Sequence, residues 1–360
     1  MSCLAGSGDR MPEKSFAFTG RVRLADVMRI ERWDPADRDT ASACYEVFLA
    51  AHSADEPIEP PKSAGTFLFT LEQGFERTPG EVWVASGAEG VAGFCRVGLP
   101  DLEDRDRAWA GPVVHPAARR RGIGRELLRH AASRAAANGR SVLDGVALSD
   151  SAGEEFARRA GATLSLAEVR RVQDLHKIPP GRIAELRASA ARAAAGYTLV
   201  TWTGPVPDEH LGKVAQVFNA FNDAPRGEGH DDEIWDADRI RDRAGAALRA
   251  GYLRGYSVAA LAGDSAEMAA ITEIVIDPEH PEWAYQQLTA VTGPHRGHRL
   301  GLLVKTAMLE WLARAEPKLE RIATGNAAAN EHMIAVNETL GYEVAEPGYR
   351  FYEIPVSEVH

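Results

Sequence analysis

The second half of this chain repeats the first, and this repeat restricts the fold more than any other feature. The segment HPAARRRGIG at 115–124 aligns with TGPHRGHRLG at 292–301, so that Gly124 falls on Gly301 at an offset of 177 residues. Similar segments surround both glycines in the same order, which indicates an internal duplication. At 360 residues the chain is also long for one compact domain. The repeat therefore predicts a loose tail at 1–20, an N-terminal domain at 21–177, a linker helix at 178–196 and a C-terminal domain at 197–360.

Hydrophobic periodicity predicts an α/β order of elements in both halves. The first half should contain a strand at 27–33, helices at 37–51 and 65–74, a hairpin at 82–97, a strand at 107–114, an Ala/Leu-rich helix, a strand at 141–148, a helix at 154–162 and a strand near 168–175. The second half should contain a strand at 198–204, helices at 208–222 and 236–250, a hairpin at 256–276, a strand at 286–291, a helix at 302–315, a strand at 321–326, a helix at 330–342 and a strand at 349–354.

Charge and composition exclude several classes of partner. A net charge of −11 makes nucleic acid a poor partner, because binding phosphates requires a surplus of Lys and Arg. No apolar run approaches the roughly 20 residues that a membrane-spanning helix needs. Cys3, Cys44 and Cys95 are too few and too scattered for a disulfide framework. We therefore expect a cytoplasmic protein that binds neither nucleic acid nor a membrane; the sequence gives no indication of its oligomeric state.

The segment RRRGIG at 119–124 lies between a predicted strand and a predicted helix. Gly122 and Gly124 remove side chains where the first N–H groups of the helix point outward, and the helix dipole adds positive charge there. Three arginines supply the local charge that the whole chain lacks. Such a turn suits a pyrophosphate, although a basic helix cap would look the same. It lacks the Lys-Ser/Thr of a P-loop and the third glycine of a dinucleotide turn.

The segment VVHPAARRRGIG resembles the signature of the GNAT-type N-acetyltransferase superfamily, Arg/Gln-x-x-Gly-x-Gly/Ala after Val-x-Pro. The resemblance covers about residues 22–175 and, more loosely, 197–355, where Arg299 replaces the first glycine. It implies two tandem domains, each a mixed, mostly antiparallel twisted sheet flanked by helices. It also implies acetyl-CoA as co-substrate, with its pyrophosphate in the turn. We expect no metal site, because the H-x-x-H of His295 and His298 is followed by no carboxylate or third histidine at ligand spacing. The cofactor-binding residues that it implies are Val113, Val114, Arg119, Arg120, Arg121, Gly122, Ile123, Gly124, Ala290, Val291, Arg296, Gly297, His298, Arg299, Leu300, Gly301 and Asn330.

The family's second signature, Asn-x-x-Ala-x-x-x-Tyr, matches the last helix of the second half with Asn330 in the Asn position. In the family, the Tyr usually protonates the leaving thiolate. Asn337 occupies that position in the second half, and Ala157 occupies it in the first. Asn337 can hydrogen-bond to a thiolate but cannot give it a proton. Tyr285 and Tyr342 are alternative acids, although the sequence favours a core or interface tyrosine at both positions.

An amine acceptor must lose a proton before it attacks a thioester, and a carboxylate usually accepts that proton. Glu273 lies inside the apolar run AAITEIVI, and carboxylates are seldom buried without a partner or a purpose. We expect Glu273 to be the base, with an outward-facing position on the strand as the alternative and Glu282 as the second candidate. The acidic run at 228–233 could attract a cationic amine or could be a solvated loop.

Together these features predict an N-acetyltransferase that transfers the acetyl group of acetyl-CoA to a primary amine of a small metabolite, by direct attack of the amine on the thioester. Glu273, Tyr285 and Asn337 are the expected catalytic residues, so the acceptor is expected against the C-terminal domain. The alternative is a duplicated acyl-CoA-binding module without catalysis, which the missing family Tyr in both halves favours. The sequence does not identify the acceptor amine.

Overall fold

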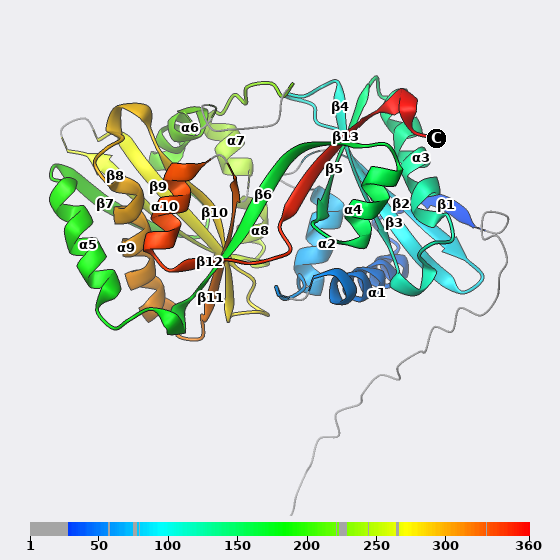
Figure 1. The fold of residues 1–360 in the computed structure, drawn as a ribbon. Helices are drawn as coiled ribbons and strands as arrows, with labels where there is room; N and C mark the ends of the chain where they lie inside the picture. Colours follow the sequence, from blue (N-terminus) through cyan, green and yellow to red (C-terminus); the bar gives the residue numbers. More distant parts are fainter. Residues whose placement is uncertain are drawn as a thin grey trace, which may run out of the picture.

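The computed structural model describes residues 28–360, apart from 57, 75–77, 79, 221, 223–228, 244, 264–265 and 329. The tail predicted at 1–20 lies outside the described residues. Figure 1 shows two lobes, one from each half, which lie side by side and are bridged by the long strand β6 (Thr163–Asp174). None of the helices in the described part of the chain is long and apolar enough to cross a membrane.

The strands of both halves join into one sheet of thirteen strands among the described residues. The other first-half strands are β1 (Arg29–Arg32), β2 (Gly80–Gly87), β3 (Gly90–Gly98), β4 (Arg107–Val114) and β5 (Val142–Leu148). The second half supplies β7 (Tyr197–Thr203), β8 (Arg254–Ala262), β9 (Met268–Ile276), β10 (Trp283–Val291), β11 (Arg321–Ala327), β12 (Tyr342–Val344) and β13 (Tyr349–Pro355). The pairs β4–β5 and β10–β11 are parallel and the others antiparallel, which confirms the mixed, mostly antiparallel sheet.

The two halves exchange strands at the centre of this sheet. The order is β1-β2-β3-β4-β5-β13-β6-β11-β10-β9-β8-β7, with β12 beside β6. The last strand of the chain, β13, therefore lies between two first-half strands, and β6 pairs with β11 of the second half from Glu168 to Asp174. The domain boundaries at 177 and 197 stay a prediction, but the hydrogen bonds of β6 and β13 cross them. Each half needs a strand of the other to complete its part of the sheet.

Helices cover both faces of the sheet in each half (Figure 1). In the first half, α1 (Arg38–Asp55) and α2 (Ala64–Gln73) share an apolar cluster with β2 and β3, α3 (Ile123–Ala137) packs on the opposite face, and α4 (Ala152–Arg159) contacts β5. In the second half, α6 (Leu211–Ala220) and α7 (Ala237–Asp242) share one cluster, α5 (Arg182–Ala193) and α9 (Leu300–Ala315) share another, and α8 (Gly245–Arg249) and α10 (Glu331–Thr339) follow α7 and β11.

The structure corrects several predicted bounds. The helix expected at 208–222 begins with a 3₁₀ turn at 208–210 and ends at Ala220. The helix expected at 236–250 is divided into α7 and α8, because Arg243 leaves the helical conformation at φ −44° and ψ −96°. The short strand β12, which follows Gly341, carries too few residues to show a periodicity and was not predicted. The expected linker helix is α5, which packs through Leu186 and Ala190 into the core around α9.

In each half, the two parallel strands separate shortly after they begin to pair. The pairing of β4 with β5 extends only from Arg107 to Trp109 on β4, and that of β10 with β11 only from Trp283 to Tyr285 on β10. In β10 an irregularity in register lies at the point of separation, next to Gln286. The gap that opens beyond each pair is where a ligand can reach strand backbone that is not already hydrogen-bonded.

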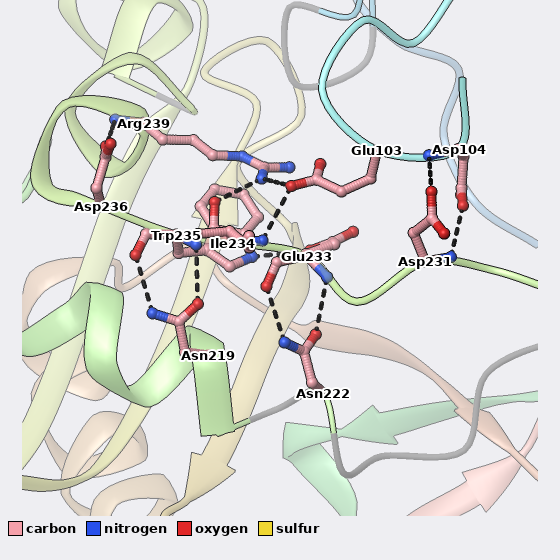
Figure 2. Close-up of polar contacts among 10 residues, drawn as sticks. All are labelled: Glu103, Asp104, Asn219, Asn222, Asp231, Glu233, Ile234, Trp235, Asp236 and Arg239. Carbon is pink, nitrogen blue, oxygen red and sulfur yellow. Dashed lines mark hydrogen bonds and ion pairs between the residues drawn. The ribbon is translucent and has the colours of Figure 1, made fainter.

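Two loops fasten the halves together in a similar way. The backbone N–H of Asp104, between β3 and β4, donates to Asp231 Oδ2 at 3.0 Å, and the N–H of Asp231 donates to Asp104 Oδ1 at 2.8 Å (Figure 2). His230 Nδ1 lies 2.7 Å from Asp104 Oδ2. Beside them, Glu103 accepts a bond from Arg239 Nη1 at 2.7 Å. The acidic segment at 228–233 is thus a contact between the halves over its described residues.

The corresponding contact on the other side joins the loop before α2 to the loop after β9. Asp277 Oδ2 accepts bonds from the Ser63 N–H at 3.1 Å and from Thr66 Oγ1 at 3.0 Å. In both contacts, a carboxylate that follows β3 or β9 accepts hydrogen bonds from a loop between two helices of the other half. Each of these two loops is therefore held in place by the opposite half.

The pair between His230 and Asp104 makes the first contact depend on pH. The hydrogen bond that His230 donates to the Asp104 carboxylate raises the pKa of His230 above its usual value, although burial opposes this. A raised folded-state pKa stabilises the fold below the unfolded pKa of about 6.5, and this stabilisation is lost as pH rises through the folded value. Asp104→Asn should therefore destabilise the protein more at about pH 5.5 than at about pH 9, by about 1 kcal/mol or less. Thermal unfolding at both pH values checks this; equal losses would contradict it.

Candidate functional site

A cavity of about 980 Å³ lies in the first half, where β4 separates from β5. Side chains from α1 line one end of it, and α3 and α4 line the other. The predicted cofactor residues on its wall are Val113, Val114, Arg119, Arg120, Gly122, Ile123 and Gly124. Several other wall residues were not expected from the sequence, among them Phe48, His52, Glu56, Arg125, Leu128, Phe156 and Arg159. They lie in α1, α3 and α4 or directly follow α1, so only the folded chain brings them together.

The turn between β4 and α3 holds two residues in the left-handed conformation, Arg120 at φ 64° and Gly122 at φ 89°. A Cβ at Gly122 would meet no atom within 4 Å, so the backbone there faces open space. A Cβ at Gly124 would lie 3.3 Å from the Phe156 ring of α4, so this ring packs closely on the glycine. The first N–H groups of α3 have no acceptor within the helix. A flexible diphosphate fits the turn at Gly122.

Arg119 braces the turn. Its Nη1 donates to Asp55 Oδ1 at 2.8 Å, and its Nε donates to the Val114 carbonyl at 3.2 Å. The end of α1 is thereby tied to the end of β4. Arg120, Arg125 and Arg159 also line the cavity and provide positive charge for a phosphate group, whereas Arg121 is not part of the wall described. The predicted phosphate contacts of these arginines stay a prediction.

The α1 end of the cavity is acidic. Glu56 lines the cavity, and Arg170 of β6 donates to its Oε2 at 2.6 Å and to Glu59 Oε1 at 3.1 Å. Only 1% of the Arg170 side chain is exposed. Burial raises the pKa of Glu59 to about 7, against the opposing effect of Arg170 and with a further rise from Glu56. Two carboxylates share one guanidinium, so the cluster carries one negative charge in excess or holds one proton.

Two tyrosines border this cluster. Tyr349 of β13 lies with its ring 5.8 Å from the Arg170 guanidinium, and burial raises its pKa to about 12. Tyr285 of β10 was predicted as an acid for the C-terminal domain. The structure instead places it among charges of the first half: burial, followed by Glu59, raises its pKa well above the usual range. Both hydroxyls therefore stay protonated at neutral pH, and the role of Tyr285 as an acid stays a prediction.

The second turn, between β10 and α9, has two left-handed residues at the same positions as the first turn but carries different side chains. Gly297 at φ 85° and Arg299 at φ 56° hold the left-handed positions, in the order opposite to Arg120 and Gly122. Arg299 Nη1 donates to Ser189 Oγ of α5 at 2.8 Å. The α5 helix packs along α9, so the Arg299 side chain is held by the protein itself. Of the predicted residues around this turn, Ala290, Val291, Leu300 and Gly301 are buried or half-buried, whereas residues 296–299 are exposed. The His298 ring lies 5.6 Å from that of Tyr197.

Behind the second turn, a buried lysine fills the strand separation. By the 177-residue offset, Lys305 of α9 corresponds to Leu128, which lines the cavity of the first half. Lys305 Nζ donates to Gln286 Oε1 at 3.0 Å and lies 4.9 Å from the centre of the Tyr342 ring. Burial lowers the pKa of Lys305 to about 7. The proposed acid Tyr342 is therefore a packing partner of this lysine.

The acid predicted as the base, Glu273, lies on β9 and forms an ion pair with Arg243 at 3.1 Å. The hollow beside it has a volume of about 40 Å³, much smaller than the cavity of the first half. Pairs of β9 with β8 and β10 place it opposite Ser257 and Leu288. The structure shows an ion pair at this position, and the catalytic role of Glu273 stays a prediction.

The two asparagines of the last helix have structural partners. Asn330 caps α10, because its Oδ1 accepts a bond from the Met333 N–H at 3.2 Å. Asn337 is fully buried, and its Nδ2 donates to Asn326 Oδ1 at 2.8 Å. Its Oδ1 has no hydrogen-bond partner among the described residues. Neither contact tests the predicted roles, and both explain why asparagine stands at these positions.

Comparison with known families agrees with this geometry. Residues 78–161, which contain β2 to α4 and the first turn, match the family described as an acetyltransferase (GNAT) domain. The mycothiol acetyltransferase of Mycolicibacterium paratuberculosis is 27% identical over 253 residues, which cover 68% of this chain and 69% of that protein. The matched family segment contains most of the large cavity's wall.

Solved structures share the complete two-lobed arrangement. A tandem GNAT protein from the clavulanic acid biosynthesis pathway superposes with a TM-score of 0.76 and is 27% identical, covering 91% of this chain and 98% of that one. A GCN5-related N-acetyltransferase from Sphaerobacter thermophilus superposes with a TM-score of 0.62 over 91% of this chain and 96% of its own, at 16% identity. The second similarity is one of fold alone.

Proposed function

The chain belongs to the GNAT acetyltransferases in their tandem two-domain form, and from this premise we propose that its first half transfers the acetyl group of acetyl-CoA to a primary amine of a small molecule. The observation that carries the proposal is the cavity of about 980 Å³, whose wall includes both the phosphate-binding turn and Glu56, which Arg170 joins to Glu59. Transfer requires both features, because the thioester must meet a deprotonated amine.

The residues present fit acetyl-CoA at three places. Gly122 leaves space for the diphosphate, and Arg120, Arg125 and Arg159 on the cavity wall offer it positive charge. The separated end of β4, with Val113 and Val114 on the cavity wall, offers backbone groups to the thioester. In the second half, Arg299 and Lys305 occupy the matching positions. This supports one acetyl-CoA site per chain, in the first half rather than in the half that the last-helix signature favoured.

The acidic cluster supplies the proton chemistry in this proposal. Glu56, ionised because Arg170 and two backbone N–H groups lower its pKa against the effect of burial, attracts the ammonium group. Glu59 takes one proton from the ammonium, directly or through water. The amine nitrogen then attacks the carbonyl carbon, the C–S bond breaks, and the sulfur leaves with its electron pair. The second N–H proton passes to the thiolate or to solvent, so that amide and free thiol are formed.

A small acceptor is favoured by the contacts between the halves. The loop before α2 is fixed by Asp277, and Glu56 on the cavity wall is held by Arg170, which also contacts the Tyr349 ring. A protein substrate would have to displace these contacts to insert a lysine side chain. A small primary amine enters without doing so.

A non-catalytic acyl-CoA-binding module is the second candidate, favoured by the absence of the family Tyr at Ala157 and Asn337. Release of free CoA thiol in the presence of a panel of primary amines separates the two. Thiol release that depends on an amine supports transfer. Acetyl-CoA binding without thiol release for any amine would establish the module instead.

Gly124→Val should weaken acetyl-CoA binding by about tenfold or more, because the added side chain must displace the Phe156 ring of the cavity wall, and overpacking costs about 1–3 kcal/mol. Calorimetry measures both the affinity and the stoichiometry. The matched control is Gly301→Ala in the second turn, which should leave one site of unchanged affinity. Loss of binding in the control, with normal binding in Gly124→Val, would place the site in the second half.

A further inference from the structure

Alternation along β4 divides its side chains between the two faces of the sheet. Ala108 and Ala110 belong to the apolar cluster under α3, whereas Val113 packs against the cluster formed by α1 and α2. Trp109 and Gly111 share the face of Val113. At Gly111 this face is open, because an added Cβ would meet no atom within 4 Å. The α1 face of β4 is therefore uncovered before the strand reaches the cavity.

Strand register continues this open face across the centre of the sheet. Trp109 pairs with Asp144 on β5, so Val146 lies on the same face two residues further on, and Val146 pairs with Phe351 of β13. The rings of Trp109 and Phe351 lie edge to face, with centroids 6.5 Å apart and planes at 84°. Trp109 is 36% exposed and Val146 is 54% exposed. These three side chains, together with Leu166 opposite Phe351, form what we call the apolar floor.

Charged groups bound the apolar floor at both ends. At one end Arg107 is buried with Asp144 and bonds to Glu353, close to the contact made by Asp104. At the other end Leu148 lines the acetyl-CoA cavity and pairs with Tyr349, beyond which lies the Glu56–Arg170–Glu59 cluster. The floor thus continues the same sheet face into the end of the cavity where a negative charge is in excess.

We propose that the apolar floor binds the carbon skeleton of the acceptor, and that the acceptor is a primary amine with an apolar or aromatic body rather than a polyhydroxylated one. This rests on the proposed function of the first half. Trp109 and Val146 are exposed on the same sheet face, which favours contact with an apolar ligand. The acidic cluster at the cavity end attracts the ammonium group of the same molecule. The acidic cluster and the apolar floor together therefore favour an amphipathic ligand that binds in one orientation.

The test compares 2-phenylethylamine with ethylamine, which carry the same amine and differ by the phenyl ring. In the wild-type protein the ratio of their kcat/KM values should be about 10-fold to 100-fold in favour of the aryl amine, the range expected for burying one aromatic ring. Trp109→Ala should reduce this ratio by about fivefold or more, with unchanged acetyl-CoA affinity. Gly111→Leu, which projects into the open face, should raise KM for 2-phenylethylamine more than for ethylamine. Leu164→Ala, an exposed apolar residue paired with Tyr352 on the other face, is the matched control and should leave the ratio unchanged.

The same ratio is measured as dissociation constants, by calorimetry on the CoA-bound protein, so the inference is tested even where turnover is slow. If neither amine is acetylated but Trp109→Ala still lowers the binding ratio, the proposed transfer fails and the apolar floor stands. If both amines are acetylated and neither variant changes the ratio, the floor is not part of the acceptor site. A ratio unchanged by Trp109→Ala, with a loss of thermal stability, would assign Trp109 to packing and overturn the proposal.

Discussion

Replacing Glu59 with glutamine should slow acetyl transfer at neutral pH by about 100-fold to 10,000-fold, the usual contribution of a general base. The substitution keeps the shape of the side chain and removes its ability to accept a proton. Acetyl-CoA binds at the other end of the cavity, so its affinity should stay within about twofold of the wild-type value. Single-turnover transfer and calorimetry measure the two effects separately.

The pH profile distinguishes a base from a merely structural acid. Burial raises the pKa of Glu59 to about 7, and the groups that face it are Arg170, Glu56, Tyr285 and Tyr349. Below that pH the protonated carboxyl cannot accept a proton, so kcat/KM of the wild-type protein should fall about tenfold for each pH unit. In Glu59→Gln this acidic limb should disappear until the ionisation of the amine itself dominates.

Glu273→Gln is the matched control, because Glu273 is the acid that the sequence indicated and it also pairs with an arginine. If the active site lies in the first half, Glu273→Gln should change turnover little. A large loss in Glu273→Gln with near-normal turnover in Glu59→Gln would move the chemistry to the second half. It would also support the role of general base that the sequence predicts for Glu273.

The phosphate-binding turn was accessible from the sequence because its geometry is local. Gly122 and the helix start that follows it lie within a few residues of each other, and left-handed backbone favours glycine wherever it occurs. The same locality allowed the second turn to be found, with Arg299 in a left-handed position. Local patterns did not show that α5 contributes Ser189 as a partner of Arg299, since an Ala-rich amphipathic helix does not specify its neighbours.

The acidic cluster was not accessible in this way. Glu56 and Glu59 stand in a Pro-rich segment, and Arg170 lies 111 residues beyond Glu59 in a strand. They meet only because β6 crosses between the halves and β13 is inserted beside it. A strand's alternation predicts its faces but not its neighbours, so the exchange of β6 and β13 could not be derived from periodicity. The available signal was an arginine pair, Arg170 and Arg171, between two valines of a strand.

That arginine pair provides the prediction with the largest effect on stability. Arg170→Met should lower the free energy of unfolding by about 3–5 kcal/mol near pH 8, because it leaves the Glu56 and Glu59 carboxylates buried without their shared cation. Arg170 lowers the pKa of Glu56, and a depressed folded-state pKa stabilises the fold above the unfolded value and loses that effect as pH falls. The penalty of Arg170→Met should therefore shrink towards about pH 4.5, where both carboxyls of the variant are protonated.

Arg171→Met is the adjacent control, on the opposite face of the same strand. Arg171 is buried to a similar degree, but its Nε and Nη1 have no hydrogen-bond partner among the described residues. Its replacement should cost less than Arg170→Met and show little dependence on pH, since no carboxylate loses a counter-charge. Denaturant unfolding of both variants at the two pH values makes the comparison. Equal and pH-independent losses would show that the Glu56–Arg170–Glu59 cluster stabilises by packing, and that its excess negative charge is not available to an acceptor amine.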